Sequence, residues 1–568
     1  MRHHQNTIAS LLSPLLGLPH EDVAKLIEVP QKNGQGDLAL ACFSFAKTLK
    51  QSPQIIAQNL VQNIQKNPLP PEIEKVQCES GYINFFVNAS ELAKSILPTL
   101  LSSDQPIGKK DPNNAKPIVI EFSSPNIAKP FSIGHLRSTN LGACLSRIYM
   151  HQGWSVERIN HLGDWGTQFG KLITAYKLWG LDLDLSSEPI DKLFKLYVRF
   201  HKEEESNPDL LDQARQAFAK LEAGDQETHK LWTMFCDFTK KEFQQLYAQL
   251  GVTFDHLWGE SFYMPHVPQL FEDLRSKHLV FQDQGAQIID LKDHKLGVAV
   301  LQKGDESSLY ITRDLAAARY RFDTFDFERM IYVVGSEQAH HFQQLFKILE
   351  LMGAAFFDRC EYVNFGQISF GKEKMSTRKG NVVFLKDVLS RAQEEVLKVI
   401  QSKNPDLKGQ EDIAKQVALG ALLYADISAR RIKNIKFDWD DILSFEGETG
   451  PYLQYSYVRM QSLIRKFDQG LSSELNMDEL KEPEEIKLVK QLAWLEHALE
   501  KVIEHNEPFF LGKYLMETTQ CFNKFYQKCR ILDQAAPTAH MRMSLVCATA
   551  HVIKTGLDLL GIPTPERM

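Results

Sequence analysis

Residues 121–138, EFSSPNIAKPFSIGHLRS, hold side chains suited to phosphate chemistry, and they lie between an apolar run and a helical pattern. A helix that begins near Ser132 presents free backbone N–H groups and the positive end of its dipole to an anion. Gly134 lets a ligand approach the backbone, His135 can donate a hydrogen bond and Lys129 adds positive charge. These features predict a phosphate site without the spacing of a P-loop.

A second basic segment, GKEKMSTRKGN at residues 371–381, places four cations between glycines: Lys372, Lys374, Arg378 and Lys379. Placed cations are suited to neutralising a triphosphate or a departing pyrophosphate. Taken singly, each segment has a structural alternative. The first is then a strand-to-helix turn with a packed histidine, and the second is a solvated surface loop. Together they favour a nucleotide site.

The elements that must position these side chains form an α/β architecture. The strand-like runs PIVIEF and RMIYVVG lack hydrophobic alternation, and each is followed by a long helical pattern. This order predicts a doubly wound, Rossmann-like parallel sheet, whose ligands bind beyond the carboxyl ends of the strands. Residues 121–138 occupy such a position.

Two to four domains are expected, because single cores stop growing near about 250 to 300 residues. Residues 1–110 mix helical patterns with strands such as GYINFFV, which predicts an N-terminal α+β domain. The α/β domain is expected at 111–410, and the helical stretch DKLFKLYVRFHKEEES indicates an insertion at about 175–300. Strand signals disappear after about residue 410, so we expect an all-helical domain over 411–568.

Composition excludes several other classes of protein. Lys and Arg number 65 and Asp and Glu 72, so the net charge of −7 excludes a uniformly basic coat for nucleic acid. The eight cysteines form no C-x-x-C pair. Neither structural zinc nor a disulfide framework is indicated, and a reducing cytoplasm is expected. No apolar run of about 18 or more residues is present, so we expect no membrane span.

Pro130–His135 resembles the HIGH signature of class I aminoacyl-tRNA synthetases, and Lys374–Arg378 resembles their KMSKS signature, in the expected order. The chain more specifically resembles the arginyl-tRNA synthetases. The similar segments are SSPNIAKPFSIGHLRST, HLGDWGTQFG, YITRDLAAARYR, GSEQAHHFQQ, FEGETGPYLQYSYVR and the final Met568. The resemblance extends from the N-terminal domain to the last residue and implies an arginine–tRNA ligase.

The resemblance assigns residues to both signatures. The HIGH-like region comprises Pro125, Asn126, Ile127, Ala128, Lys129, Pro130, Phe131, Ser132, Ile133, Gly134 and His135, and the KMSKS-like loop comprises Lys374, Met375, Ser376, Thr377 and Arg378. Ser132 replaces the first histidine of HIGH, and Thr377 replaces the second lysine of KMSKS. The family implies that a lysine before HIGH, here Lys129, supplies the missing charge. The expected catalytic residues are Lys129, Ser132, His135, Lys374 and Ser376.

An arginine pocket should offer carboxylates and an aromatic or hydroxyl neighbour, because the guanidinium is planar and always protonated. The resemblance implies that Glu121, Tyr310 and Asp314 hold the guanidinium. It assigns the α-amino and carboxylate groups to Asn126 and Gln338, and the wall of the pocket to Trp165.

Two carboxylates unpaired without arginine would reject uncharged isosteres strongly, so no editing domain is expected. Glu121 closes an apolar strand, where a carboxylate needs a partner. Two alternatives stay open: Asp314 as a helix N-cap, and Tyr310 and Trp165 as packing aromatics.

The resemblance implies two-step chemistry: arginine attacks the α-phosphate of ATP, pyrophosphate leaves, and the arginyl group passes to the 3′-terminal ribose of tRNA(Arg). Lys129, His135, Lys374 and substrate-associated Mg²⁺ are expected to balance charge on the phosphates. The resemblance also implies a monomer. Two rival functions remain open. One is a nucleotidyltransferase or another class I synthetase, and the other is a non-catalytic RNA-binding paralogue.

Tyr452 and Tyr455 lie three residues apart on one predicted helix face, downstream of a basic cluster of Arg430, Arg431, Lys433 and Lys436. RNA bases stack on such aromatic faces with basic support. The alternative is a packed aromatic face with a solvated basic edge. The resemblance makes Tyr452, Tyr455 and Met568 anticodon contacts, and makes Asn84 a contact to the tRNA elbow.

Overall fold

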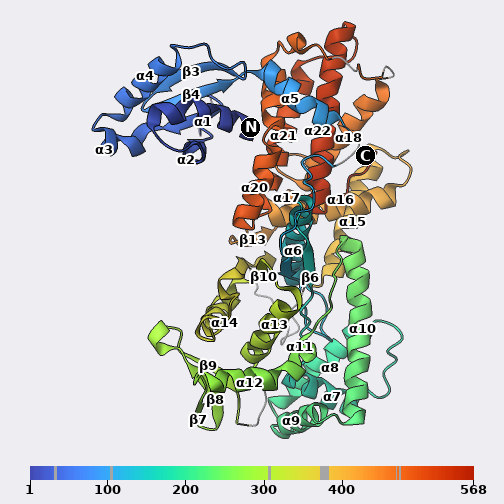
Figure 1. The fold of residues 1–568 in the computed structure, drawn as a ribbon. Helices are drawn as coiled ribbons and strands as arrows, with labels where there is room; N and C mark the ends of the chain where they lie inside the picture. The colour runs from blue at the N-terminus through green and yellow to red at the C-terminus, as the bar shows by residue number, and fades with distance from the viewer. Residues whose placement is uncertain (31–34, 103–105, 305–308, 371–382, 468–469, 473–474) are drawn as a thin grey trace. The chain divides into compact units, whose positions relative to one another are not determined.

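The computed structural model describes residues 1–30, 35–102, 106–304, 309–370, 383–467, 470–472 and 475–568. The chain forms two compact units (Figure 1). The larger unit comprises Lys109–Tyr455, Val502–Gly512 and Leu557–Met568. The smaller unit comprises Met1–Gly108, Ser456–Lys501 and Lys513–Gly556.

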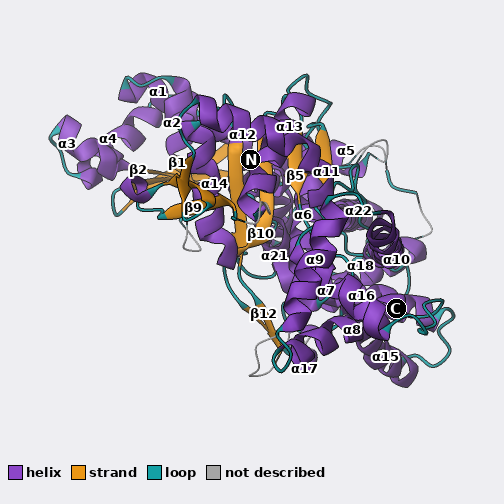
Figure 2. Ribbon diagram, turned by 90° about the horizontal axis from the view of Figure 1, so that it is seen from below, coloured by secondary structure: helices purple, strands orange, loops and turns teal. Residues whose placement is uncertain are grey.

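A parallel four-stranded sheet with the order β11-β10-β5-β6 lies at the centre of the larger unit. Its strands are β5 (Ile118–Glu121), β6 (Val156–Ile159), β10 (Arg329–Gly335) and β11 (Cys360–Phe365). All four residues of β5 are buried, which suits a central strand covered on both faces. Figure 2 shows β5 and β10 side by side among the surrounding helices. The predicted parallel α/β architecture is confirmed.

Helix α6 (Ile133–His151) packs beside β5 and is buried on nearly all sides. Gly142 makes this close approach possible, because a Cβ atom there would lie 2.2 Å from Cβ of Phe122. Phe122 directly follows β5. The packing therefore fixes the first turn of α6 at the carboxyl edge of the sheet, where ligands of doubly wound folds bind.

The insertion between β6 and β10 is mostly helical. Its helices are α7 (Thr167–Trp179), α8 (Pro189–Glu204), α9 (Asp209–Glu222), α10 (Gln226–Leu250), α11 (Glu260–Tyr263) and α12 (Val267–Ser276). An antiparallel sheet of β7 (Phe281–Asp283), β8 (Ala286–Asp290) and β9 (Val298–Gln302) follows. The insertion leads into α13 (Tyr310–Phe325), and α14 (Ala339–Leu351) follows β10.

One short strand lies beyond residue 410, where we expected helices alone. After β11 come β12 (Ile368–Phe370), α15 (Leu385–Lys403), α16 (Gln410–Ile427), β13 (Ile435–Phe437), α17 (Trp439–Ile442) and α18 (Gly450–Lys466). Strand β13 pairs in parallel with β12. Three residues are too few to show a period of two, and the partner strand is distant in sequence. The sequence pattern therefore could not reveal β13.

The smaller unit contains an antiparallel sheet with the order β1-β2-β4-β3. Its early elements are α1 (Arg2–Leu16), α2 (His20–Leu26), β1 (Ile27–Glu28), β2 (Leu38–Ala41), α3 (Ala46–Leu49), α4 (Pro53–Ile64), β3 (Ile73–Glu79), β4 (Tyr82–Val87) and α5 (Ala89–Leu101). The same unit includes α19 (Pro483–Leu492) and parts of α18, α20 (Leu495–His505), α21 (Phe509–Lys528) and α22 (Ala536–Leu560).

An ion pair of 2.8 Å joins Lys490 of α19 to Asp37, so the N-terminal sheet packs with late helices. The compact units thus follow packing and not sequence order. The domain boundaries at residues 110 and 410 stay predictions. Helix α22 is apolar and long enough to cross a membrane, but 83% of its most apolar window is buried inside the protein. Such burial is typical of a core helix.

Candidate active site

Ser132 is the N-cap of α6, which agrees with the predicted helix start. The Ser132 backbone N–H donates a hydrogen bond of 3.1 Å to Nδ1 of His135. Because Nδ1 is an acceptor, the proton of the neutral imidazole lies on Nε2. Burial and the nearby charge of Lys129 lower the pKa of His135 to about 4. His135 can therefore donate a hydrogen bond at neutral pH but carries no charge.

This neutrality corrects one sequence-based prediction. We expected His135 to share in balancing the charge of the phosphates, and a neutral imidazole can only donate a hydrogen bond to them. Among the residues that the structure describes, Lys129 is the cation whose charge acts on His135 at the start of α6. Its Nζ lies 3.3 Å from Oε1 of Gln168 and 5.0 Å from the ring centre of Tyr197.

The segment that carries Lys129 holds an unusual backbone. Ser123, Ser124 and Ala128 have φ angles of 71°, 46° and 58°, in the left-handed region that non-glycine residues rarely adopt. Hydrogen bonds hold these conformations, among them one of 3.0 Å from the Ala128 N–H to Oγ1 of Thr239. Such local strain is typical of functional sites and needs surrounding structure to maintain it.

Asn126 lies against the loop that follows β6, where it forms a bridge with Gly163. A Cβ atom on Gly163 would lie only 2.5 Å from Oδ1 of Asn126, so a larger residue there would force the Asn126 side chain to shift. Oδ1 of Asn126 also lies 3.4 Å from Nε2 of Gln168. Because Gln168 contacts both Asn126 and Lys129, it joins the predicted arginine-binding and phosphate-binding residues.

Glu121 and Asp314 are brought together by a chain of buried polar side chains. Arg321 donates from Nη1 to Oε2 of Glu121 over 2.5 Å and from Nη2 to Nδ1 of His161 over 3.0 Å. Since Nδ1 of neutral His161 accepts, its proton lies on Nε2, which is 3.5 Å from Oδ1 of Asp314. His341 closes the chain with a contact of 2.6 Å from Nε2 to Oδ2 of Asp314.

The chain corrects the prediction that both carboxylates are unpaired without substrate. Glu121 is 6% exposed and faces the guanidinium of Arg321, while Asp314 faces two imidazoles. A buried carboxylate is costly without a partner, so the fold supplies one from its own sequence. A guanidinium that binds at either carboxylate must therefore share or displace an existing partner.

These contacts and burial shift the pKa values of Asp314, His341 and His161. Burial alone would raise the pKa of Asp314, but its hydrogen bond with His341 and the imidazole charges hold that pKa below the usual value. Burial opposes charge on His341, yet the same hydrogen bond raises the pKa of His341 above 6.5. Burial lowers the pKa of His161. The network thus favours an ionised Asp314 and a protonated His341.

Tyr310 is the first residue of α13, and Leu309 is the N-cap, so the alternative that Asp314 caps this helix is wrong. Tyr310 and Asp314 lie four residues apart and hence on one helix face. Tyr310 is 57% exposed, and its ring centre lies 4.9 Å from the guanidinium carbon of Arg313. The Arg313 guanidinium pairs in turn with Glu260 at 3.1 Å.

Trp165 and Gln338 complete the predicted pocket. The Trp165 ring packs against Phe218 and Trp232, and its buried Nε1–H has no hydrogen-bond partner among the described residues. An unsatisfied buried donor of this kind can serve a ligand. Gln338 is exposed in a short turn between β10 and α14. No contact between Gln338 and the buried network is present in the described part of the chain.

Four residues of the site were not expected from the sequence: Arg321, His161, His341 and Gln168. Each lies inside a segment that resembles the family: His161 and Gln168 in HLGDWGTQFG, Arg321 in YITRDLAAARYR and His341 in GSEQAHHFQQ. Their positions inside these family-like segments were therefore the signal in the sequence that could have identified them. The KMSKS-like residues Lys374, Met375, Ser376, Thr377 and Arg378 lie outside the described residues.

The predicted tRNA contacts differ in accessibility. Tyr455 is 41% exposed and Tyr452 is half-buried on α18, and Met568 is half-buried. Asn84 is only 3% exposed and lies on β4, the strand between β2 and β3. The structure thus contradicts a direct contact from its side chain to RNA. In the upstream basic cluster, Arg430 and Arg431 pair with Glu507.

No group of three or more metal-ligating side chains is found where the chain is described.

The parallel sheet with a capped helix at its carboxyl edge is the architecture of a class I aminoacyl-tRNA synthetase. Three family descriptions match the chain: "tRNA synthetases class I (R), catalytic domain" at residues 96–439, "DALR anticodon binding domain" at 453–568, and "Arginyl tRNA synthetase N terminal domain" at 2–87. The chain belongs to the arginyl-tRNA synthetase family.

Relatives agree over the full length. An "Arginine--tRNA ligase" of Alkaliphilus metalliredigens is 41% identical over 569 residues and covers 100% of both chains. Another from Clostridioides difficile is 43% identical over 551 residues and covers 97% of each. The structure of the Thermus thermophilus arginyl-tRNA synthetase has a TM-score of 0.84 at 25% identity and covers both chains completely. The predicted family is confirmed.

Proposed function

We propose that this chain ligates L-arginine to tRNA(Arg) in two steps, with the active site at the carboxyl ends of β5, β6 and β10. In the first step a carboxylate oxygen of arginine bonds to the α-phosphorus of ATP, and the bond to pyrophosphate breaks. In the second step a ribose hydroxyl of the tRNA attacks the arginyl carbonyl, and AMP leaves. The observations that carry the proposal are the capped start of α6 and the buried polar chain that links Glu121 through Arg321 and His161 to Asp314.

In the adenylation step the first turn of α6 binds the phosphates of ATP. Its free backbone N–H groups, Nε2–H of His135 and the ammonium of Lys129 are the donors. Ser132 holds His135 in the required tautomer through the contact to Nδ1. Lys374 and Ser376 are proposed as further phosphate contacts. Mg²⁺ enters with the nucleotide, whose phosphates supply its oxygen ligands.

For the amino acid, we assign the substrate guanidinium to Asp314 and Tyr310, with Trp165 as the adjacent wall. Asp314 is ionised, half-buried and bound by imidazoles that a guanidinium can displace. Glu121 contributes through the network, since Arg321 already occupies one of its oxygens. Asn126 and Gln338 are assigned to the α-amino and carboxylate groups. An uncharged isostere would leave Asp314 with fewer partners and is therefore rejected.

For the tRNA, Tyr452, Tyr455 and Met568 are proposed to contact the anticodon, and the N-terminal domain is proposed to contact the elbow. Asn84 is withdrawn from this set because of its burial. The enzyme is proposed to act in the cytoplasm as a monomer. Seven of its eight free cysteines are buried, which suits a compartment that keeps thiols reduced.

ATP–pyrophosphate exchange and tRNA charging test the proposal. The purified chain should charge bulk tRNA with arginine and with none of the other nineteen standard amino acids, and exchange should be measured with and without tRNA. Charging with cysteine or glutamate would support another class I synthetase. A complete lack of charging, with tRNA still bound, would support the non-catalytic paralogue. Lys129→Ala should reduce the rate of adenylation while leaving tRNA affinity unchanged.

A further inference from the structure

One face of helix α8 contacts both Lys129 and the residues at the start of α15. Asp191, Phe194 and Tyr197 lie at intervals of three residues and therefore share this face. The ring of Tyr197, which is 7% exposed, lies 5.0 Å from Nζ of Lys129. This distance is within the range of a cation–π contact, so the tyrosine ring restrains the position of the ammonium.

The other two residues of this face contact residues 383–386, the segment at the start of α15. Asp191 pairs with Nζ of Lys386 at 2.6 Å, and the ring of Phe194 meets that of Phe384 edge-on at 6.2 Å. Lys386 also lies over the Phe384 ring, 5.8 Å from its centre. The segment is thus held to α8 by one ion pair and one aromatic contact.

The same segment is bonded to the cap of α6. The Ile133 N–H donates to the carbonyl of Val383 over 3.0 Å, and the Leu385 N–H donates to the carbonyl of Phe131 over 2.9 Å. Ser132 and Phe384 form the antiparallel bridge between these two bonds. Because the bridge includes the N-cap residue, a displacement of Phe384 also displaces the backbone that orients His135.

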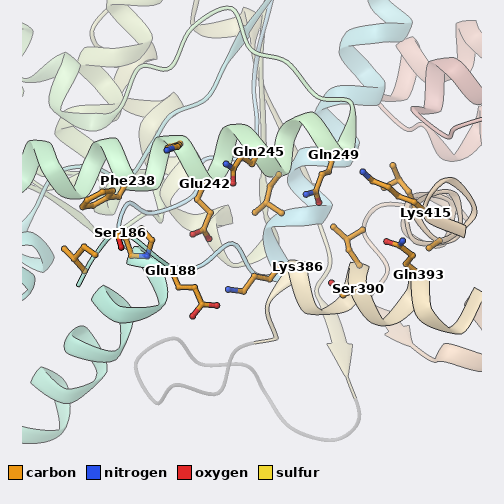
Figure 3. A pocket seen from close by; sticks show the side chains of 17 residues that line it. Ser186, Glu188, Phe238, Glu242, Gln245, Gln249, Lys386, Ser390, Gln393 and Lys415 are labelled. Atoms are coloured by element: carbon orange, nitrogen blue, oxygen red, sulfur yellow. The ribbon is translucent and has the colours of Figure 1, made fainter. Parts of the chain in front are cut away.

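The neighbouring carboxylates stabilise the charge of Lys386 at this position. Burial disfavours its charge, but the hydrogen bond to Asp191 and the charge of Glu242 raise the pKa of Lys386. Figure 3 shows Lys386 extending toward Glu188 and Glu242 at the cavity between α10 and α15. The Lys386 side chain is still 38% exposed, and ion pairs that are this exposed contribute little to overall stability. A stabilising role alone therefore does not account for the arrangement.

We propose that Asp191, Phe194 and Tyr197 are positioning residues of the adenylation site. Tyr197 fixes Lys129 for the phosphates, and Asp191, through Lys386 and Phe384, fixes the Ser132 cap. The insertion helix α8 thereby sets the affinity for ATP without touching it. This inference rests on the proposed roles of Lys129 and Ser132 in binding ATP.

The test measures KM for ATP, KM for arginine and kcat in ATP–pyrophosphate exchange at saturating tRNA, with thermal unfolding alongside. Tyr197→Leu removes the aromatic face and should raise KM for ATP by about three- to tenfold, whereas Tyr197→Phe keeps the face and should stay near wild type. Asp191→Asn should raise KM for ATP by about threefold or more. In both cases KM for arginine and the unfolding temperature should stay nearly unchanged, which a merely structural role does not predict.

Two controls complete the design. Asp212→Asn breaks an exposed pair with Arg215 on the neighbouring helix α9 and should change no kinetic constant. Reversal of the pair in the double variant Asp191→Lys with Lys386→Asp should recover part of the ATP affinity that each single change loses.

Lys129→Ala distinguishes the positioning role of α8 from the phosphate site itself. If Lys129→Ala raises KM for ATP but Tyr197→Leu and Asp191→Asn do not, the positioning role of α8 is wrong and the phosphate site stands. If Lys129→Ala itself has no effect, the proposed phosphate site is wrong. Equal losses in KM for ATP, KM for arginine and thermal stability would also overturn the inference, because they indicate general unfolding.

Discussion

At the scale of single residues, the site depends on which buried charge meets which partner. Glu121 closes an apolar strand in the sequence and therefore needs a partner, and the resemblance to the family implied substrate arginine as that partner. The structure shows an internal guanidinium from Arg321 in that place. No periodicity connects residues 200 positions apart, so only the folded chain could reveal the pair. The sequence thus indicated that Glu121 needs a partner but did not indicate that the partner is Arg321.

Arg321→Met should destabilise the fold strongly. It leaves Glu121 buried and unpaired and removes the contacts to Tyr263 and His161. We expect a loss of about 3 to 5 kcal/mol in the free energy of unfolding, measured by urea denaturation. Arg319→Met, two residues earlier on α13, breaks a more exposed pair with Asp273 and should cost about 0 to 1 kcal/mol. Equal costs for the two variants would contradict a buried, uncompensated Glu121.

The His341 contact predicts a pH dependence for arginine binding. The charged and titratable groups around it are Asp314, His161, Glu121 and Arg321. Protonated His341 competes with substrate for Asp314, so KM for arginine should fall as the pH rises through the raised pKa of His341. The same pair stabilises the fold at low pH, and this contribution is lost above the folded-state pKa.

The measurement is KM for arginine between about pH 6 and 9 in the wild type, in His341→Gln and in His340→Gln. Glutamine at position 341 cannot become charged, so its KM should lose this dependence on pH, while the exposed neighbour His340 serves as the matched control. A profile in His341→Gln that is identical to wild type would assign the titration to another group.

At the scale of elements, packing overrides local propensity inside α6. The sequence predicted this helix and its start, because both depend on local pattern and capping. It could not predict that Gly142 is required for contact with Phe122, since that contact depends on how the helix crosses the sheet. The short strand β13 was missed for a related reason, because its partner β12 lies far upstream.

Gly142→Ala should therefore destabilise the protein although alanine favours helices. The new Cβ would lie 2.2 Å from Phe122, and overpacking of this kind costs about 1 to 3 kcal/mol. Gly134→Ala in the same helix meets only Oγ of Ser132 at 3.5 Å and should leave the free energy of unfolding unchanged or raise it. Urea unfolding of both variants provides the comparison. A stabilised Gly142→Ala would show that α6 can shift on the sheet.

At the scale of the whole molecule, the chain separates the small-molecule site from the proposed RNA contacts. The buried network and the phosphate cap belong to the carboxyl edge of the parallel sheet, while Tyr452 and Tyr455 lie on α18. Composition and motifs predicted this division because each part carries its own local signal, and the division stays a prediction. They could not show that the N-terminal sheet packs with α19, which depends on contacts such as Lys490 with Asp37.

The division predicts that RNA contacts can be weakened without loss of adenylation. Tyr455→Ala removes an exposed ring, and loss of one base–aromatic stack costs about 1 to 3 kcal/mol, so tRNA should bind roughly fivefold or more weakly in filter-binding titrations. Tyr455→Phe keeps the stacking face and should retain affinity. Phe281→Ala removes a ring that is 55% exposed on β7 and is the control for a general loss of aromatic surface. KM for ATP and arginine should stay constant throughout, because Tyr455 lies on α18 and the proposed adenylation residues lie on other elements. A rise in either constant would mean that α18 also shapes the catalytic site.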